Sequence, residues 1–190
     1  MKSVFASAYR YRGVLMAPPY LVLMFVFVAE VERDDVIWPI GLIIFSISIC
    51  IRIWAQIYLH YRLPVHKCLT KDGPYAIVRN PIYVANTLML LGLTVLSELI
   101  WFLPVMLLWC VLVYGMVVRR EEAHLAEKYG QPYRDYQCAV PRWIPNFQLR
   151  GRLIGYGMIH RYLVRSIIAE AHCLLLLVPM IGKELLSNWW

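Results

Sequence analysis

Long apolar runs alternate with short polar segments along most of the chain. A helix needs about 20 predominantly apolar residues to cross the hydrocarbon core of a bilayer, and five runs come close to or reach that length. They cover residues 13–29, 37–58, 82–97, 101–118 and 167–186. The pattern therefore predicts a bundle of about five transmembrane helices.

The third and fourth runs are separated by only three residues, which predicts a tight helical hairpin. The fourth helix is expected to continue beyond the membrane through residues 119–129 and to end at Gly130. Residues 141–145 begin and end with proline and are predicted to be extended or turn-like.

Ionisable side chains lie inside two of the apolar runs. Arg52, near the end of the second run, is expected to extend toward the headgroups. The last run contains Glu170, His172 and Pro179, so an amphipathic or re-entrant helix is the alternative to a fifth span. Glu170 is expected to pair with His172, or the two to line a cavity.

Composition supports a lipid environment. The chain has 190 residues, of which 61% are hydrophobic and 16% charged. An ordinary soluble domain is about 45–50% apolar and about 25% charged, and a small one has too little interior to bury more. A soluble globular fold, a disordered chain and a secreted disulfide scaffold are therefore excluded. The predicted fold class is all-α, a polytopic membrane helix bundle with a cytosolic C-terminal catalytic segment.

Loop charges predict the orientation of the bundle. The formal net charge is +7. Basic residues concentrate in the N-terminal stretch and in residues 60–80 and 119–165. Residues 30–36, in contrast, contain one basic residue, and residues 98–100 contain none. Because basic loops face the cytoplasm, the N-terminus and the polar segments are predicted to be cytoplasmic. The five cysteines have no spacing that indicates a disulfide framework or a zinc site, and we predict neither a metal site nor nucleic-acid binding.

Two polar segments on the predicted cytoplasmic side hold the candidate chemistry. In residues 73–83, Pro81 suits the first position of a helix, and helix N-termini attract anions. Arg79 and Asn80 come directly before it. The second segment is the Glu121–Glu122 pair. If the hairpin packs its helices side by side, the two segments lie at the same level. Their charges would then form a suitable binding site for a zwitterion that carries an amino and a carboxylate group.

Simpler interpretations remain open for these charges. Arg79 could be an interfacial anchor, since basic side chains extend from membrane helices toward water. The glutamate pair could consist of helix-surface charges neutralised by Arg119 and Arg120.

The ordered set of GPYAIVRNPIYVAN, a hydrophobic hairpin and REEAHLAEKYGQPYRDYQCAVPRWIP resembles the isoprenylcysteine carboxyl methyltransferase and phospholipid methyltransferase group of membrane enzymes. The resemblance covers residues 51–145. It implies S-adenosyl-L-methionine as methyl donor. The cofactor-binding residues it implies are Tyr75, Arg79, Asn80, Pro81, Tyr83, Glu121 and Glu122. The catalytic residues it implies are Arg79 and Arg142, with Arg142 near the acceptor.

Two departures concern the acceptor. Asn80 stands where the isoprenylcysteine enzymes usually have His, and Ala139 where they have Arg, which disfavours prenyl-cysteine. A lipid-like or other amphiphilic small molecule is expected instead, with membrane lipids as further partners. Residues 1–145 are predicted to form the membrane-embedded methyltransferase domain, and residues 146–190 a basic interfacial segment plus the fifth helix. The alternatives are a sterol-type double-bond reductase using NADPH, which shares a similar motif, and a non-enzymatic small membrane protein.

Overall fold

The computed structural model describes residues 12–26, 33–66, 69–148 and 156–187. All secondary structure within these ranges is helical, as the sequence predicts. The elements are α2 (Arg12–Leu15), α3 (Ala17–Phe25), α4 (Asp34–His66), α5 (Pro74–Ile77), α6 (Pro81–Leu96), η1 (Ile100–Phe102), α7 (Leu103–Tyr129), α8 (Gln131–Ala139), α9 (Tyr156–Glu170), η2 (Ala171–Leu176) and α10 (Leu177–Ser187).

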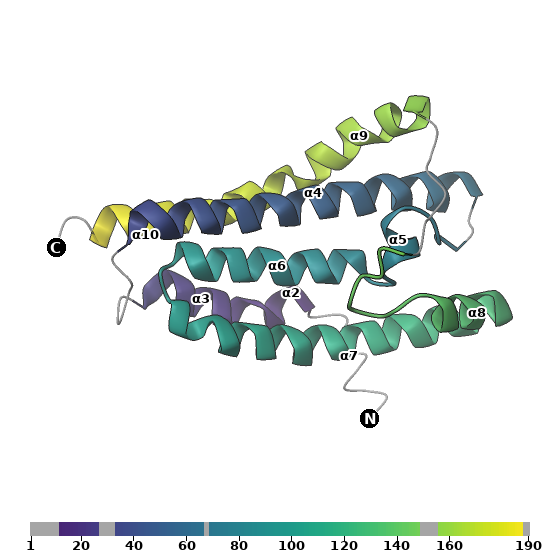
Figure 1. Cartoon of the computed structure of the whole chain (residues 1–190), viewed down its shortest axis with the longest axis horizontal. Coiled ribbons are helices and arrows are strands. Elements are labelled where there is room, and N and C mark those ends of the chain that lie inside the picture. The colour runs from purple at the N-terminus through teal and green to yellow at the C-terminus, as the bar shows by residue number, and fades with distance from the viewer. Residues whose placement is uncertain (1–11, 27–32, 67–68, 149–155, 188–190) are drawn as a thin grey trace.

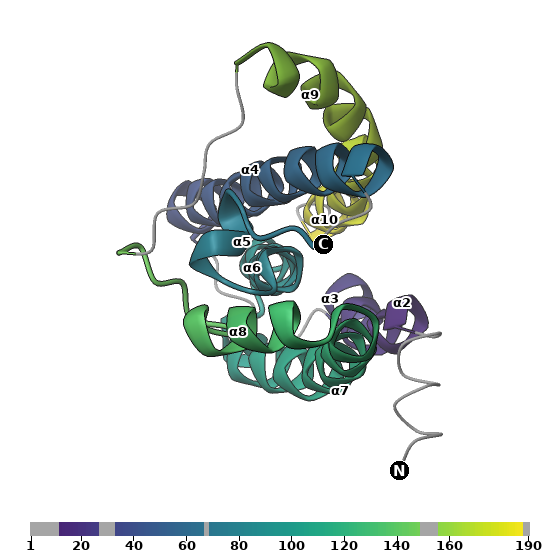
Figure 2. The ribbon, with the colours of Figure 1, turned by 90° about the vertical axis from the view of Figure 1, so that its right-hand side faces the viewer.

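Helix α6 lies at the centre of an elongated bundle. Figure 1 shows α4, α6 and α7 side by side along the long axis, and α9 packs against α4. In the view turned by 90°, α10 and α3 lie on one side of α6, between α4 and α7 (Figure 2). A Cβ added at Gly92 of α6 would lie 3.0 Å from the backbone nitrogen of Phe45 in α4. Small residues therefore let these two helices pack closely, as is common between membrane helices.

Among the described residues, three helical stretches have the length and composition to cross a membrane: Asp34–His60, Ile100–Tyr129 and Tyr162–Leu186. They contain the second, fourth and fifth predicted spans. The third predicted span is α6, whose 16 residues extend about 24 Å at 1.5 Å per residue, short of the roughly 30 Å of a hydrocarbon core. Its crossing, and hence the count of five, stays a prediction.

The first apolar run is not one continuous helix. Helix α2 ends at Leu15 and α3 begins at Ala17, with Pro18 and Pro19 in its first turn. Proline is tolerated there, but it cannot donate the hydrogen bonds that would continue the preceding turn. The predicted span is therefore two short helices, and residues 27–29 lie outside the described residues.

The last run is helical throughout but changes type. Residues Ala171–Leu176 form a 3₁₀-helix between α9 and α10. Pro179 follows in α10 and cannot donate to the carbonyl of Leu175, which accounts for the change in hydrogen-bond pattern.

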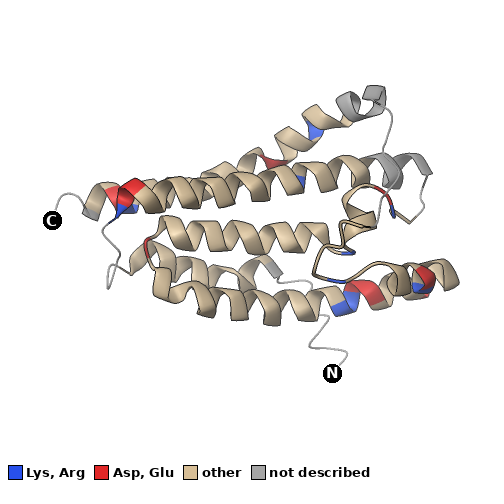
Figure 3. Ribbon diagram, viewed as in Figure 1, with Lys and Arg blue, Asp and Glu red and all other residues tan. Residues whose placement is uncertain are grey.

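The start of α4, the α6–α7 turn and the end of α10 meet at one end of the bundle. Carboxylate oxygens of Asp34, Glu98 and Glu184 all lie within 4.8 Å of one another. The buried Lys183 donates from Nζ to the carbonyl of Ser97 at 2.7 Å. Charged residues lie mostly at the two ends of the bundle and are sparse between them (Figure 3). Helices α5 and α8 lie at the opposite end (Figure 1).

The expectations for Arg52 and Glu170 are wrong. Arg52 does not extend to the headgroups, because its Nε lies 2.5 Å from Oε2 of Glu170. Glu170 thus pairs with Arg52 and not with His172, which is exposed. The reason is tertiary: α9 packs along α4 and brings an acidic partner to the arginine.

Candidate active site

A tight turn positions the segment before α6. Gly73 has a φ of +60°, and an added Cβ would lie 2.5 Å from the ring of Tyr58. Only glycine fits such a position. Helix α5 follows, and α6 begins with Pro81 in its first turn, as predicted. Arg79 and Asn80 are thereby held between two helices at one end of the bundle.

Glu122 of α7 is the buried acid of the site, with 4% of its surface exposed. Its carboxylate accepts two hydrogen bonds from Arg142, at 2.6 Å from Nη2 and 3.2 Å from Nε. Nη1 of Arg79 lies 3.6 Å from Oε1 of Glu122, and Nδ2 of Asn80 lies 3.4 Å from it. The predicted meeting of the two polar segments is therefore present.

Glu121, the adjacent residue, contacts a different partner. The hydroxyl of Tyr83 donates to its Oε1 at 2.8 Å. The ring of Tyr83 packs against that of Tyr114, with centroids 5.3 Å apart. Consecutive helix positions point about 100° apart, so the two carboxylates serve neighbouring places, one lined by guanidinium groups and one by a phenol.

Residues 140–148 fold back onto the segment before α6. The backbone nitrogen of Arg79 donates to the carbonyl of Pro141 at 2.9 Å, and that of Asn146 donates to the carbonyl of Ile77 at 3.0 Å. Nδ2 of Asn80 also donates to the carbonyl of Arg142 at 3.3 Å. These bonds bring Arg142 to Glu122.

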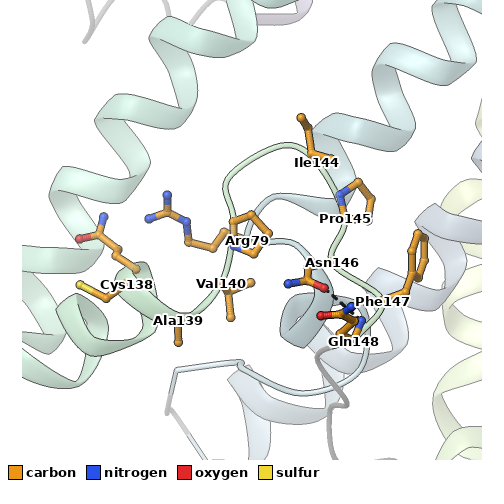
Figure 4. Close-up of a pocket in the computed structure, with 11 residues that line it drawn as sticks. Arg79, Cys138, Ala139, Val140, Ile144, Pro145, Asn146, Phe147 and Gln148 are labelled. Atoms are coloured by element: carbon orange, nitrogen blue, oxygen red, sulfur yellow. Dashed lines mark hydrogen bonds between the residues drawn. The ribbon is translucent and has the colours of Figure 1, made fainter.

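A cavity of about 870 Å³ opens beside Arg79. Arg79 reaches it from the segment before α6, and the rest of the lining comes from residues 137–141 and 144–148 (Figure 4). Ile144 and Phe147, 80% and 78% exposed, present apolar surface there. Small-molecule sites usually measure about 300–1,000 Å³. The cavity is thus large enough for a nucleoside-sized ligand.

One donor beside this cavity is not used within the described part of the chain. Nε of Arg79 is buried and has no hydrogen-bond partner there. Buried donors are nearly always paired in folded proteins, so this nitrogen indicates a place for an acceptor group that the described residues do not supply.

Three tyrosines around α8 remain neutral at physiological pH. Burial raises the pKa of Tyr133 to about 12, and the carboxylate of Glu122 contributes. Burial also raises the pKa of Tyr75 and of Tyr136 above the usual value. The hydroxyl of Tyr136 donates to the carbonyl of Tyr75 at 2.6 Å. These side chains can donate hydrogen bonds and offer apolar surface, but they cannot serve as bases.

The structure brings most of the predicted site residues together. Those that meet are Arg79, Asn80, Pro81, Tyr83, Glu121, Glu122 and Arg142. The ring of Tyr75 packs against the cluster of Ile57, Tyr58 and Tyr162, and the carboxylate of Glu121 contributes to its raised pKa, so Tyr75 also lies close to the site. Their roles in binding and catalysis stay predictions.

The simpler interpretations of the charges lose support. Arg79 is not an isolated anchor, since it lies beside a buried carboxylate. Glu122 is not a surface charge, and its ion pairs in the described residues go to Arg79 and Arg142, whereas Arg119 and Arg120 are exposed.

Sequence reasoning missed Tyr114 and the lining residues Gln137 and Asn146. Tyr114 lies inside an apolar run, where nothing distinguishes it from a residue of the core. The other two depend on the return of the 140–148 loop.

Comparison with known families identifies the bundle. A sequence model described as phospholipid methyltransferase matches residues 36–132, just over half of the chain. The chain belongs to the phospholipid methyltransferase family. No solved structure gives a significant match.

Two curated proteins resemble this member of the phospholipid methyltransferase family. The cobalt-zinc-cadmium resistance protein CzcN of Cupriavidus metallidurans is 30% identical over 110 residues, which cover 58% of this chain and 50% of that protein. The nickel-cobalt-cadmium resistance protein NccN of Alcaligenes xylosoxydans xylosoxydans is 29% identical over 120 residues, which cover 61% of this chain and 55% of that protein. The chain spans about half the length of these relatives.

The family match covers Arg79, which precedes α6, and Glu121 and Glu122 of α7. It ends before Arg142 and before the residues of α8 and the loop that line the cavity. The part of the site that closes over Glu122 therefore lies outside the matched region.

Proposed function

We propose that this protein is an integral-membrane methyltransferase that uses S-adenosylmethionine and acts on a lipid-like or other amphiphilic acceptor, in the manner of the isoprenylcysteine carboxyl methyltransferases. One observation carries the proposal: a buried carboxylate, Glu122, lies between Arg79 and Arg142, and Arg79 also lines a cavity of nucleoside size. Membership of the phospholipid methyltransferase family supports the reaction type.

The charges present fit the cofactor. S-adenosylmethionine carries a carboxylate, an ammonium and a sulfonium group. Arg79, with a buried Nε that has no partner among the described residues, would hold the carboxylate. Glu121 and Glu122 would hold the positive groups, and the electron-rich ring of Tyr83 would support a cation next to it.

The reaction asks the protein mainly for positioning. When bound, S-adenosylmethionine supplies a methyl group whose bond to sulfur breaks as a lone pair of an acceptor oxygen, nitrogen or sulfur bonds to carbon. The residues of the site would fix the two partners in line, which in well-oriented reactions replaces about 7–11 kcal/mol of the barrier. Arg142, with its side chain 37% exposed, is the guanidinium best placed to contact an acceptor as well as Glu122.

The apolar surroundings favour an amphiphilic acceptor. Ile144 and Phe147 are exposed where they line the cavity, and the long helices expose many large apolar side chains. An acceptor could enter sideways from the bilayer, while the soluble cofactor enters from the cytoplasm, the side to which the basic loops assign this end. The names of the two relatives concern resistance to metals and name no reaction; a methylated membrane component is compatible with such a role.

Thermal unfolding of the purified protein tests the proposal. S-adenosylmethionine and its demethylated product should raise the melting temperature, because a ligand at 100 times its Kd stabilises the folded state by about 2.7 kcal/mol. The shift should vanish in Glu122→Gln and persist in the exposed control Arg119→Gln, each compared with its own ligand-free state. Stabilisation by NADPH instead would support the reductase, and no shift with any of these ligands would support a non-enzymatic protein.

A further inference from the structure

An ion pair lies inside the membrane-spanning part of the bundle, away from the site. Arg52 belongs to the apolar stretch Asp34–His60 and Glu170 to the stretch Tyr162–Leu186. Their side chains are 13% and 2% exposed. Ionisable residues within membrane helices are rare and usually functional. A buried ion pair is often no more stabilising than apolar residues of the same volume, so stability alone does not account for this one.

The pair is connected to the candidate site. Nη1 of Arg52 donates to Oδ1 of Asn86 on α6. The side chain of Asn86 also lies close enough to the hydroxyl of Tyr114 on α7 to interact with it. The ring of Tyr114 packs against that of Tyr83, whose hydroxyl donates to Glu121. A continuous series of contacts therefore runs from α9 across α4, α6 and α7 to the carboxylate pair.

The hydrogen-bonding chemistry of these groups determines how Arg52 orients the side chain of Asn86. A guanidinium group only donates, so Arg52 can bond only to the oxygen of the Asn86 amide. This fixes the orientation of the amide and leaves its NH₂ group for the hydroxyl of Tyr114. Asn86 follows Tyr83 by three residues, about 4.5 Å along the axis of α6, so the fixed amide lies one turn below the tyrosine.

We propose that Arg52, held by Glu170, is a positioning residue for the active site. It orients Asn86 and, through Tyr114, the Tyr83 ring that holds the carboxylate of Glu121. The inference rests on the proposed function, because Glu121 matters as a ligand of the positively charged cofactor. It also gives the C-terminal segment, which lies beyond the family match, a part in the site.

The test replaces the pair by apolar residues of similar volume, Arg52→Met with Glu170→Leu, which leaves no buried charge without a partner. Asn86→Ala is the second variant, since it interrupts the series while the ion pair remains. Lys183→Met is the matched control, because it removes another buried charge at the opposite end of the bundle. Binding of S-adenosylmethionine is measured by calorimetry, and Tyr83 is observed by ¹⁹F NMR after 3-fluorotyrosine labelling, with its resonance assigned from Tyr83→Phe.

The double variant and Asn86→Ala should each weaken cofactor binding by about two- to thirty-fold, the usual range for coupling through packed networks. Both should shift the Tyr83 resonance, while Lys183→Met should do neither. Equal affinity in the double variant and the control, or an unmoved resonance in both test variants, overturns the inference. A wild-type protein that binds no cofactor defeats the proposed function instead, and the resonance then still decides whether Arg52 positions Tyr83.

Discussion

At the scale of single residues, Glu122 shows how the surroundings of a carboxylate decide its task. Two arginines and an asparagine surround it, whereas Glu121, one position earlier, faces a phenol. It could be predicted that the glutamate pair and the Arg79–Asn80–Pro81 segment lie close together, because both adjoin helices of one hairpin. Which side chains contact Glu121 and which contact Glu122 could not be predicted, since this depends on which side of α7 faces α6.

Gly73 provides the residue-scale prediction. Both Gly73 and Gly130 have positive φ, 60° and 62°, but only at Gly73 would a Cβ meet another side chain, the ring of Tyr58. Strained backbone of this kind costs about 1–3 kcal/mol. Gly130→Ala should therefore cost about that much in unfolding free energy, and Gly73→Ala more, because Tyr58 must also move.

Thermal or denaturant unfolding of the two variants checks this expectation. Gly73→Ala should in addition weaken binding of S-adenosylmethionine, since the turn holds the segment that carries Arg79. Equal losses of stability in both variants would show that the contact with Tyr58 contributes nothing.

At the scale of elements, the apolar runs and their boundary residues predicted α4, α6 and α7 well. Pro81 begins one helix and Gly130 ends another, because each residue has a conformation that suits that boundary. Helix α8, directly after Gly130, was not predicted as a separate helix.

Contacts between distant segments were beyond such reasoning. Arg52 and Glu170 are 118 residues apart, and nothing local shows that α9 packs on α4. The return of residues 140–148 rests on backbone bonds, which leave no pattern in the sequence. These are the two features that connect the C-terminal part of the chain with the site.

At the scale of the whole molecule, the two ends of the bundle differ. One end gathers Asp34, Glu98 and Glu184, and the other holds the candidate site and exposed basic residues such as Arg119 and Arg120. The positive-inside rule assigns the second end to the cytoplasm.

Cys138 reports this orientation directly. It is exposed and lines the cavity, whereas Cys110 and Cys173 are buried and the exposed Cys50 lies within the membrane-spanning stretch Asp34–His60. In a Cys68→Ser background, a membrane-impermeant maleimide should label Cys138 in inside-out vesicles and not in intact cells, with Cys138→Ser as the control. Labelling in intact cells would place the site on the outer face.

The central claim, transfer of a methyl group through the Glu122 site, is tested most directly by following the methyl group itself. Membranes that contain the protein are incubated with methyl-labelled S-adenosylmethionine, and label is measured in the lipid extract and in membrane proteins. Label should appear with the wild type, fall by about tenfold or more in Arg79→Ala and Glu122→Gln, because each removes a charge-assisted contact of about 1.5–3 kcal/mol, and persist in Arg119→Gln. No protein-dependent transfer, or equal transfer by wild type and both site variants, would contradict the account.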